Sequence, residues 1–417
     1  MNLKRVVITG LGAITPLGST VDAFWNSLLI GVSGAADITR FDASKYKTQF
    51  ACEIKGYEAT NYFERKEARK LDPYAQYAII AADEAVKDAG FNLETVDPNR
   101  VGVITGTGIG GFTTFLYDAA EFGRNEDNPR FNPFFIPKII GDIAAGHISM
   151  KYGFRGPNYA TTSACASAGH ALIDAFHYIR LGKSDIILAG GSEAGINPAG
   201  IGGFNAMHAI STRNDDPKTA SRPFDKDRDG FVLGEGAATL VLEEYEHAVK
   251  RGAKIYAELV GIGSTADAHH ITAPHPDGLG AMLAMKFALE EAGMQLQDVD
   301  HINTHGTSTP VGDIAEPKAI VSLFGEHAYN ISLNSTKSMH GHMLGAAAAV
   351  EMVATVLTIQ NDIIPPTINH FTDDPDIDNR LNFTYHKAQK RVVNLALSNS
   401  FGFGGHNTSL AVKKFKA

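Results

Sequence analysis

A duplicated segment is the feature that most restricts what this chain can fold into. Residues 88–97 (DAGFNLETVD) align without a gap to residues 291–300 (EAGMQLQDVD). Each copy follows an alanine-rich stretch at helical spacing and leads into an apolar run that ends in Gly and Thr. Chance similarity between two helix ends is the alternative, but the matching flanks favour a duplication. We therefore expect two related halves, residues 1–252 and 253–417, with residues 123–137 as an insertion in the first.

The order of predicted elements indicates a layered α/β architecture. Residues 6–10 predict a buried strand that ends at a glycine turn, and residues 21–29 predict a helix. Residues 71–89 have an amphipathic pattern closed by Gly90, as is typical of a helix end. Residues 101–105 predict a second buried strand. Because helix and strand go on alternating in this way, we expect helices packed against a sheet.

Composition excludes several classes of protein. The 417 residues are 44% hydrophobic, which is enough for a large core, and the net charge of −9 argues against general nucleic-acid binding. The two cysteines predict no disulfide framework and fit a reducing cytoplasm. The apolar run after Met1 stops at Thr9 and Gly10, which is too early for a signal peptide, and we find no 18-residue apolar run. We expect a soluble cytoplasmic protein with no membrane span.

Three local patterns suggest ligand sites that the surrounding sequence does not support. The glycines of residues 106–111 match a dinucleotide fingerprint, but the helix, strand and acidic residue that should follow are missing. Residues 225–230 open like a calcium loop, but its twelfth position is Gly236 instead of Glu. The His-Gly-His sequence at 340–342 has no matching Cys or carboxylate at zinc-ligand spacing. We therefore expect neither a metal nor an organic cofactor.

Cys165 stands where a predicted buried strand becomes a predicted helix. The strand is expected over residues 159–163, and helical spacing begins at Ala164. The free N–H groups at a helix start favour a thiolate, which is the nucleophilic form of cysteine. The alternative is a small buried cysteine that packs as a hydrophobic side chain.

The second half carries groups that a cysteine nucleophile would use. His305 follows the strand expected before Thr304, and His342 precedes an alanine-rich helix whose dipole disfavours an imidazolium. Lys337 and Glu351 flank His342. The glycines of residues 398–407 would let backbone N–H groups approach a ligand closely. Each histidine alone could be structural, but the combination favours catalysis.

These motifs resemble those of the β-ketoacyl-acyl carrier protein synthases, and most closely the elongating type II synthases of bacterial fatty-acid synthesis. The resemblance runs from Val6 to the end of the chain. It implies a thiolase-like fold of five layers, αβαβα, with duplicated halves, and a homodimer. The motifs that carry it are Ala-Cys-Ala-Ser at Cys165, Thr-His-Gly-Thr-Ser-Thr at His305, Ser-Thr-Lys-Ser-Met-His-Gly-His from Ser335 to His342, Arg-Pro-Phe-Asp at Arg222 and Asn-Ser-Phe-Gly-Phe-Gly-Gly from Asn399.

The resemblance also implies a reaction, a decarboxylative Claisen condensation catalysed by an acyltransferase. Cys165 would carry the acyl chain as a thioester, and His305 and His342 would stabilise the enolate formed from malonyl-carrier protein. Lys337, paired with Glu351, would orient the site. The N–H groups of Cys165 and Phe403 would form the oxyanion hole, and Phe401 and Phe403 would belong to the gate.

Binding roles follow from the same resemblance, with acyl carrier protein as the partner and no cofactor. Lys66, Arg69 and Lys70 would form one cationic helix face for the acidic carrier protein, a solvated charged face being the alternative. Ketosynthase chemistry in a polyketide or specialised lipid pathway is the alternative function. The substrate-binding positions implied are Ile109, Phe135, Asp267, His270, Thr307, Thr309 and Asn407.

Overall fold

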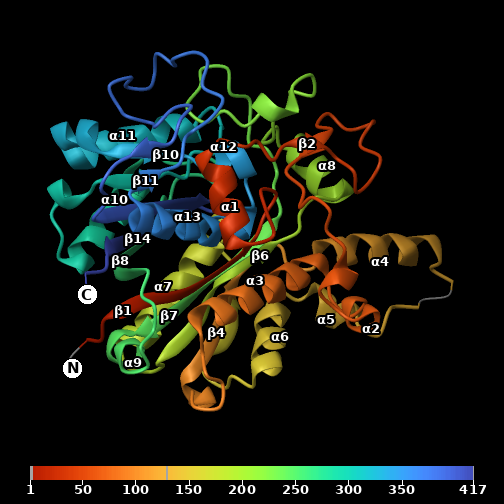
Figure 1. Cartoon of the computed structure of the whole chain (residues 1–417). Helices are drawn as coiled ribbons and strands as arrows, with labels where there is room; N and C mark the ends of the chain where they lie inside the picture. Colours follow the sequence, from red (N-terminus) through yellow and green to blue (C-terminus); the bar gives the residue numbers. More distant parts are fainter. Residues whose placement is uncertain (1–2, 128–129, 417) are drawn as a thin grey trace.

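The computed structural model describes residues 3–127 and 130–416, and its centre is a ten-stranded mixed sheet (Figure 1). The strand order is β10-β9-β13-β14-β8-β1-β7-β6-β4-β5. The sheet strands are β1 (Val6–Ile14), β4 (Val101–Gly106), β5 (Asn158–Thr161), β6 (Ile186–Glu193), β7 (Gly236–Glu244), β8 (Ala257–Ala266), β9 (His301–Asn303), β10 (Ser332–Asn334), β13 (Leu395–Gly402) and β14 (His406–Lys414). Two further antiparallel sheets of two strands each pair β2 (Ala36–Asp37) with β3 (Phe50–Ala51) and β11 (Ile363–Ile364) with β12 (Gln389–Lys390).

Each half of the sheet has the same topology. In the first half β5, β4 and β6 are parallel, and β7 and β1 follow antiparallel. In the second half β10, β9 and β13 are parallel, and β14 and β8 follow antiparallel. The two five-stranded units meet where Val6 of β1 pairs with Leu259 of β8. This repetition agrees with the duplication seen in the sequence, while the boundary at residue 252 stays a prediction.

Helices form three further layers around the two units. The helices are α1 (Val21–Leu29), α2 (Arg65–Ala68), α3 (Pro73–Ala89), α4 (Phe112–Arg124), α5 (Phe135–Ile139), α6 (Ile143–Tyr152), α7 (Ser167–Arg180), α8 (Pro198–Ala206), α9 (Tyr245–Lys250), α10 (Leu279–Ala292), α11 (Gly312–Phe324), α12 (Lys337–His340) and α13 (Ala347–Asn361). α7 and α13 pack against each other and against strands of both units, so they form the middle layer. α3 and α6 cover the outer face of the first unit, and α10 and α11 lie over that of the second (Figure 1). The thiolase-like αβαβα fold is therefore confirmed.

Helix α3 shows how local sequence sets an element's limits. Asp72 caps its start by accepting a hydrogen bond from the Tyr74 N–H, and Pro73 supplies the first helical residue. Gly90 ends the helix in the left-handed conformation with φ 63°. Gly293 ends α10 with the same φ. The two glycines of the duplicated segment thus end corresponding helices in the same conformation.

Strand β1 is longer than predicted. It continues past the expected turn at Gly10 to Ile14, with one irregularity between Ile8 and Gly10. A Cβ on Gly12 would lie 1.9 Å from the Ala81 carbonyl oxygen of α3. These glycines therefore serve helix–strand contact, and reading Gly10 as a turn was wrong.

One long apolar segment lies inside the molecule. Residues Leu344–Asn361 are long and apolar enough to cross a membrane by length and composition, with a mean hydropathy of 1.3. Glu351 interrupts the segment, so it is not a continuous run of 18 apolar residues. In the structure 89% of this segment is buried. It is the core helix α13 with the turn before it, buried on all sides because sheets lie on both of its faces.

Candidate active site

Cys165 lies in a tight 3₁₀ turn, Ala164–Ala166, between β5 and α7. Ala164 has φ 50°, a left-handed backbone that places the next residue at the head of the helix. β5 is only half-buried, because it is the edge strand of the sheet. The expectation of a buried strand before Cys165 was therefore wrong, while the expected position at a helix start is confirmed.

The thiol of Cys165 is almost completely buried, with 7% of the residue exposed. Burial raises the pKa of this thiol to about 12, which outweighs the lowering effect of the Lys337 ammonium and of the N–H groups of Phe403 and Cys165. Burial thus opposes the thiolate that the helix start alone would favour. The cysteine of the free protein is a neutral thiol.

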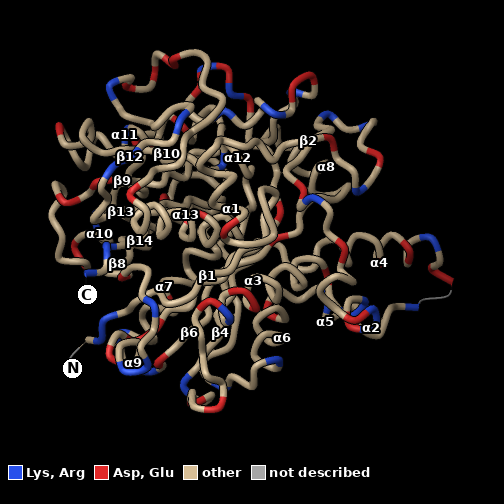
Figure 2. Tube along the Cα trace, viewed as in Figure 1, with Lys and Arg blue, Asp and Glu red and all other residues tan. Residues whose placement is uncertain are grey.

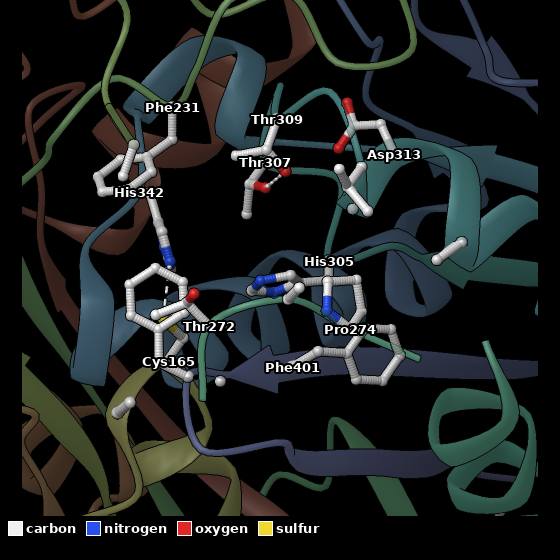
Figure 3. A pocket seen from close by; sticks show the side chains of 18 of the residues that line it. Cys165, Phe231, Thr272, Pro274, His305, Thr307, Thr309, Asp313, His342 and Phe401 are labelled. Carbon is white, nitrogen blue, oxygen red and sulfur yellow. Dashed lines mark hydrogen bonds between the residues drawn. The ribbon is translucent and has the colours of Figure 1, made fainter. Parts of the chain in front are cut away.

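His342 contacts that thiol directly. Its Nε2 lies 3.0 Å from the Cys165 sulfur (Figure 3). The backbone of His342 is held in place because its N–H donates to the Val232 carbonyl and its carbonyl accepts from the Gly234 N–H. Burial, followed by the Lys337 charge, holds the pKa of this imidazole well below its usual value. The ring is therefore neutral, as expected, although burial is the main cause and not the helix dipole.

His305 reaches the same cavity from the other side. It follows β9 by two residues, and its ring centroid lies 5.4 Å from that of His342. The Glu316 carboxylate accepts hydrogen bonds from the His305 and Gly306 N–H groups and so positions this segment. Burial, then Lys337 and His342, lowers the pKa of His305 well below its usual value. Two neutral imidazoles therefore face one cavity.

Lys337 and Glu351 form a buried ion pair behind the histidines. Lys337 begins α12, and Glu351 lies on α13 one turn into the helix. Burial raises the pKa of the Glu351 carboxyl to about 7, opposed by the Lys337 ammonium. Neither residue lines the cavity, so the pair acts on the histidines through its electric field.

The cavity has a volume of about 550 Å³, within the range of small-molecule sites. Cys165, His305 and His342 line it together (Figure 3). Seven of the other expected site residues line it as well: Ile109, Asp267, Thr307, Thr309, Phe401, Phe403 and Asn407. Phe135 and His270 do not line it within the chain described.

Two loops meet at the cavity beside the phenylalanines. The Phe401 ring lies 5.6 Å from the His305 ring. Asp267 accepts a hydrogen bond from the Asn407 side-chain amide at 2.8 Å, and its N–H donates to the Gly405 carbonyl. His270 turns back on its own loop, where its Nδ1 accepts from the Thr272 and Ala273 N–H groups. Asp267 and Asn407 thus join the loop of residues 267–273 to the Phe-Gly-Phe-Gly-Gly segment.

The expected docking residues lie outside the cavity. α2 has only four residues, so Lys66 is helical, whereas Arg69 caps the helix and Lys70 lies beyond it. The continuous helix face that the sequence suggested is therefore wrong. Lys70 is paired with Glu67 at 2.7 Å, and Glu64 and Glu67 lie among the basic residues of this segment (Figure 2).

Two buried carboxylates near the site were not anticipated. Glu193, at the end of β6, accepts hydrogen bonds from the N–H groups of Gly108, Ile109 and Gly345. Glu316 holds His305 as described above. Glu193 acts on backbone groups 84 to 152 residues away, so no local motif signals it, whereas Glu316 lies only 10 and 11 residues from the groups it holds. Within residues 3–127 and 130–416 no group of His, Cys, Asp and Glu side chains is arranged to hold a metal ion.

Two family models together match most of the chain. The model described as beta-ketoacyl synthase, N-terminal domain, matches residues 3–248, and that for the C-terminal domain matches residues 256–371. This chain belongs to the beta-ketoacyl synthase family. The resemblance found in the motifs is thereby confirmed.

Curated relatives and solved structures of this family match over nearly the full length. The chain is 47% identical to "3-oxoacyl-[acyl-carrier-protein] synthase 2" of Synechocystis sp. over 413 residues, 99% of each chain. It is also 47% identical to the protein of the same name from Staphylococcus aureus, again over 99% of each. A solved structure of a type II PKS acyl-carrier protein in complex with its ketosynthase superposes with a TM-score of 0.92 at 34% identity, covering 99% of this chain and 100% of that one.

Proposed function

We propose that this chain is a 3-oxoacyl-[acyl-carrier-protein] synthase that elongates fatty acids by condensing acyl-carrier protein with malonyl-carrier protein. One observation carries the proposal: a buried cysteine lies 3.0 Å from one of two neutral histidines that face a single cavity. The 47% identity to synthase 2 relatives supports the fatty-acid reaction over a polyketide or specialised lipid pathway.

The first step is transfer of the acyl chain to Cys165. The thiol is neutral, so its proton has to leave as sulfur attacks the thioester carbonyl. The proton passes to the departing pantetheine sulfur, which leaves as a thiol, and the His342 Nε2–H, 3.0 Å from the Cys165 sulfur, stabilises the negative charge that develops on that sulfur. The N–H groups of Cys165 and Phe403, which face the thiol, hold the oxygen of the tetrahedral intermediate.

The second step forms the new carbon–carbon bond. Malonyl-carrier protein loses CO₂, and the electron pair of the broken bond becomes an enolate whose oxygen accepts hydrogen bonds from His305 and His342. The low pKa values of His305 and His342 keep both rings neutral at neutral pH. Each ring can therefore donate an N–H to the enolate oxygen without gaining or losing a proton. The carbanion attacks the acyl-Cys165 carbonyl, and the Cys165 sulfur leaves. Lys337 with Glu351 supplies fixed positive charge behind the histidines.

The remaining cavity residues bind the substrates. Thr307 and Thr309 contact the pantetheine arm, and Ile109 lies at the acyl end with Phe135 added from a second copy. Phe401 and Phe403 gate the tunnel, with Asp267, His270 and Asn407 in the adjoining loops. Lys66, Arg69 and Lys70 dock the carrier protein, a role that the solved complex of a related ketosynthase with its carrier protein supports.

A homodimer is part of the proposal. β5 is an edge strand with a free side, and edge strands are normally covered. Large apolar side chains are exposed on α4, on α5 and on the residues beside α5: Phe115, Phe122, Phe131, Phe134, Ile136 and Ile140. A second copy pairing along β5 would cover both features. The cytoplasm is the expected compartment, since both cysteines are free.

Incubation with acyl- and malonyl-carrier protein, with the products identified by mass, tests the function. A 3-oxoacyl product two carbons longer than the acyl donor, formed with release of CO₂, is expected. Repeated extension of the unreduced product would instead indicate polyketide chemistry, and no acylation of Cys165 at all would contradict the proposal. Light scattering during size-exclusion chromatography should give twice the mass of 44.6 kDa.

A further inference from the structure

The segment of residues 307–310, between β9 and α11, has a strained backbone. Ser308 has φ 69°, a left-handed conformation that costs a non-glycine residue free energy unless its surroundings hold it. On either side of Ser308, Thr307 and Thr309 turn their side chains toward the cavity, with their hydroxyl oxygens 3.0 Å apart (Figure 3). The placement of both hydroxyls therefore depends on what holds this strained turn.

The centre of the turn is held by three neighbours. The Asp313 carboxylate accepts from the Ser308 N–H at 3.1 Å, and the Gly230 N–H donates to the Ser308 carbonyl at 3.1 Å. The Arg222 backbone N–H donates to the Ser308 hydroxyl at 3.0 Å. These contacts fix Ser308 itself but leave the carbonyls of the next two residues to another partner.

Arg228 is that partner. Its Nε donates to the Thr309 carbonyl at 3.0 Å, and its Nη2 donates to the Pro310 carbonyl at 2.7 Å. Its Nη1 is anchored on the opposite side by the Asp374 carboxylate at 2.5 Å and the Asp225 carbonyl at 2.8 Å. The side chain is 2% exposed, so water does not compete for these bonds.

We propose that Arg228 is a positioning residue for the pantetheine arm. Arg228 does not line the cavity. It acts through Thr309 and Pro310, because its planar guanidinium donates hydrogen bonds to both of their carbonyls. A lysine carries the same charge but cannot donate along fixed, divergent directions to both carbonyls and to Asp374. The inference rests on the proposed role of Thr307 and Thr309 as contacts of the pantetheine arm.

The test compares two reactions of Cys165 in Arg228→Lys. The first is acylation by octanoyl-pantetheine, measured at increasing concentrations, and the second is alkylation by iodoacetamide, which has no pantetheine arm. We expect about a tenfold loss of second-order rate in the first, mainly through weaker binding and not a slower maximal rate, and less than about a twofold change in the second. Arg222→Lys is the matched control. It keeps the backbone N–H that donates to Ser308 and changes only a buried side chain whose hydrogen bonds go to Thr219. It should behave like the wild type in both reactions.

Equal losses in both reactions, or none in either, would overturn the inference. A loss in Arg222→Lys as large as in Arg228→Lys would overturn it too. If Arg228→Lys does not fold, Asp374→Asn decides the question, because it removes the negative charge of one of the two groups that anchor Nη1 and should cause a smaller loss confined to octanoyl-pantetheine. Failure of the wild type to react with octanoyl-pantetheine at any concentration would instead contradict the proposed function.

Discussion

The two halves of the molecule use the same turn to different ends. In the first half the turn Ala164–Ala166 leads into the central helix α7, and in the second the turn Leu344–Ala346 leads into the central helix α13. Each turn begins with a non-glycine residue in the left-handed region, Ala164 at φ 50° and Leu344 at φ 45°. The second residue of the turn is Cys165 in one half and Gly345 in the other.

Space decides which half can carry the nucleophile. The Cys165 side chain opens onto the cavity. A Cβ on Gly345 would lie 2.2 Å from the Gly108 nitrogen and 2.7 Å from the Glu193 carboxylate. The second turn is closed by the loop and carboxylate of the first half, so the catalytic groups that we propose for the second half come from neighbouring residues, His342 above all. In this proposal the first copy of the turn carries the nucleophile and the second half carries its histidine partners.

Removing the nucleophile has the largest expected effect. Cys165→Ala should abolish condensation, a loss of at least about 1,000-fold, because no acyl thioester can form. Decarboxylation of malonyl-carrier protein should persist, since the histidines of the second half are unchanged. Release of CO₂ and 3-oxoacyl product are measured side by side. Condensation at the wild-type rate would end the assignment of Cys165.

Removing either histidine should mainly impair decarboxylation, the step that Cys165→Ala leaves intact. His305→Ala should still allow acylation of Cys165 but lower decarboxylation about 100-fold or more, because one donor to the enolate oxygen is gone. His342→Ala should lower decarboxylation to a similar extent and also slow acylation, since its Nε2 contacts the thiol. Mass measurement of the acyl-enzyme separates the two steps. A His305→Ala enzyme that cannot be acylated would contradict this division of labour between the halves.

Gly345→Ala tests the spatial argument. The new methyl group meets backbone and a buried carboxylate, so something has to shift, and we expect about 2 kcal/mol less stability toward unfolding. Cys165→Ala is the control, because the first turn already accommodates a Cβ and should lose far less. Denaturant unfolding of both variants gives the comparison. Equal stability of the two would show that the turns are equally open.

The duplicated glycines made the fold predictable, because Gly90 and Gly293 sit in helix ends whose chemistry is local. The prediction at Gly10 was wrong, because the sequence does not distinguish a glycine that lets a helix pack closely on a strand from a glycine that forms a turn. The motif residues Cys165, His305 and His342 were brought together as expected. Arg228 and Glu193 act through backbone atoms of distant segments, so only the tertiary structure reveals them.

Ile109→Phe tests whether the acyl chain is bound by the first half alone. Ile109 lines the cavity on the loop held by Glu193, and an aromatic ring there would shorten the acyl pocket. Each excluded methylene loses about 0.8 kcal/mol of burial, so acylation should fall progressively with chain length and stay near normal for short chains. Decarboxylation, the task of the second half, should not change. A uniform loss at all lengths would indicate misfolding, and an unchanged profile would place Ile109 outside the pocket.

The smallest expected effect concerns the carrier protein, and it should not distinguish the halves. Lys66 and Arg69 are exposed, and neither has an ion-pair partner among the described residues, so they are available to an acidic partner. Lys66→Glu with Arg69→Glu should raise KM a few-fold, by about 1 kcal/mol or less, because exposed charges act weakly and mainly on association. Both acyl- and malonyl-carrier protein should be affected alike, since each docks by its protein surface. The effect should shrink as salt is raised, because screening weakens exposed charges.

Octanoyl-pantetheine, which lacks the protein, is the control substrate and should react normally. Unchanged KM at low salt would remove this segment from the docking surface, and an effect on only one carrier substrate would show that the two halves recruit their substrates separately.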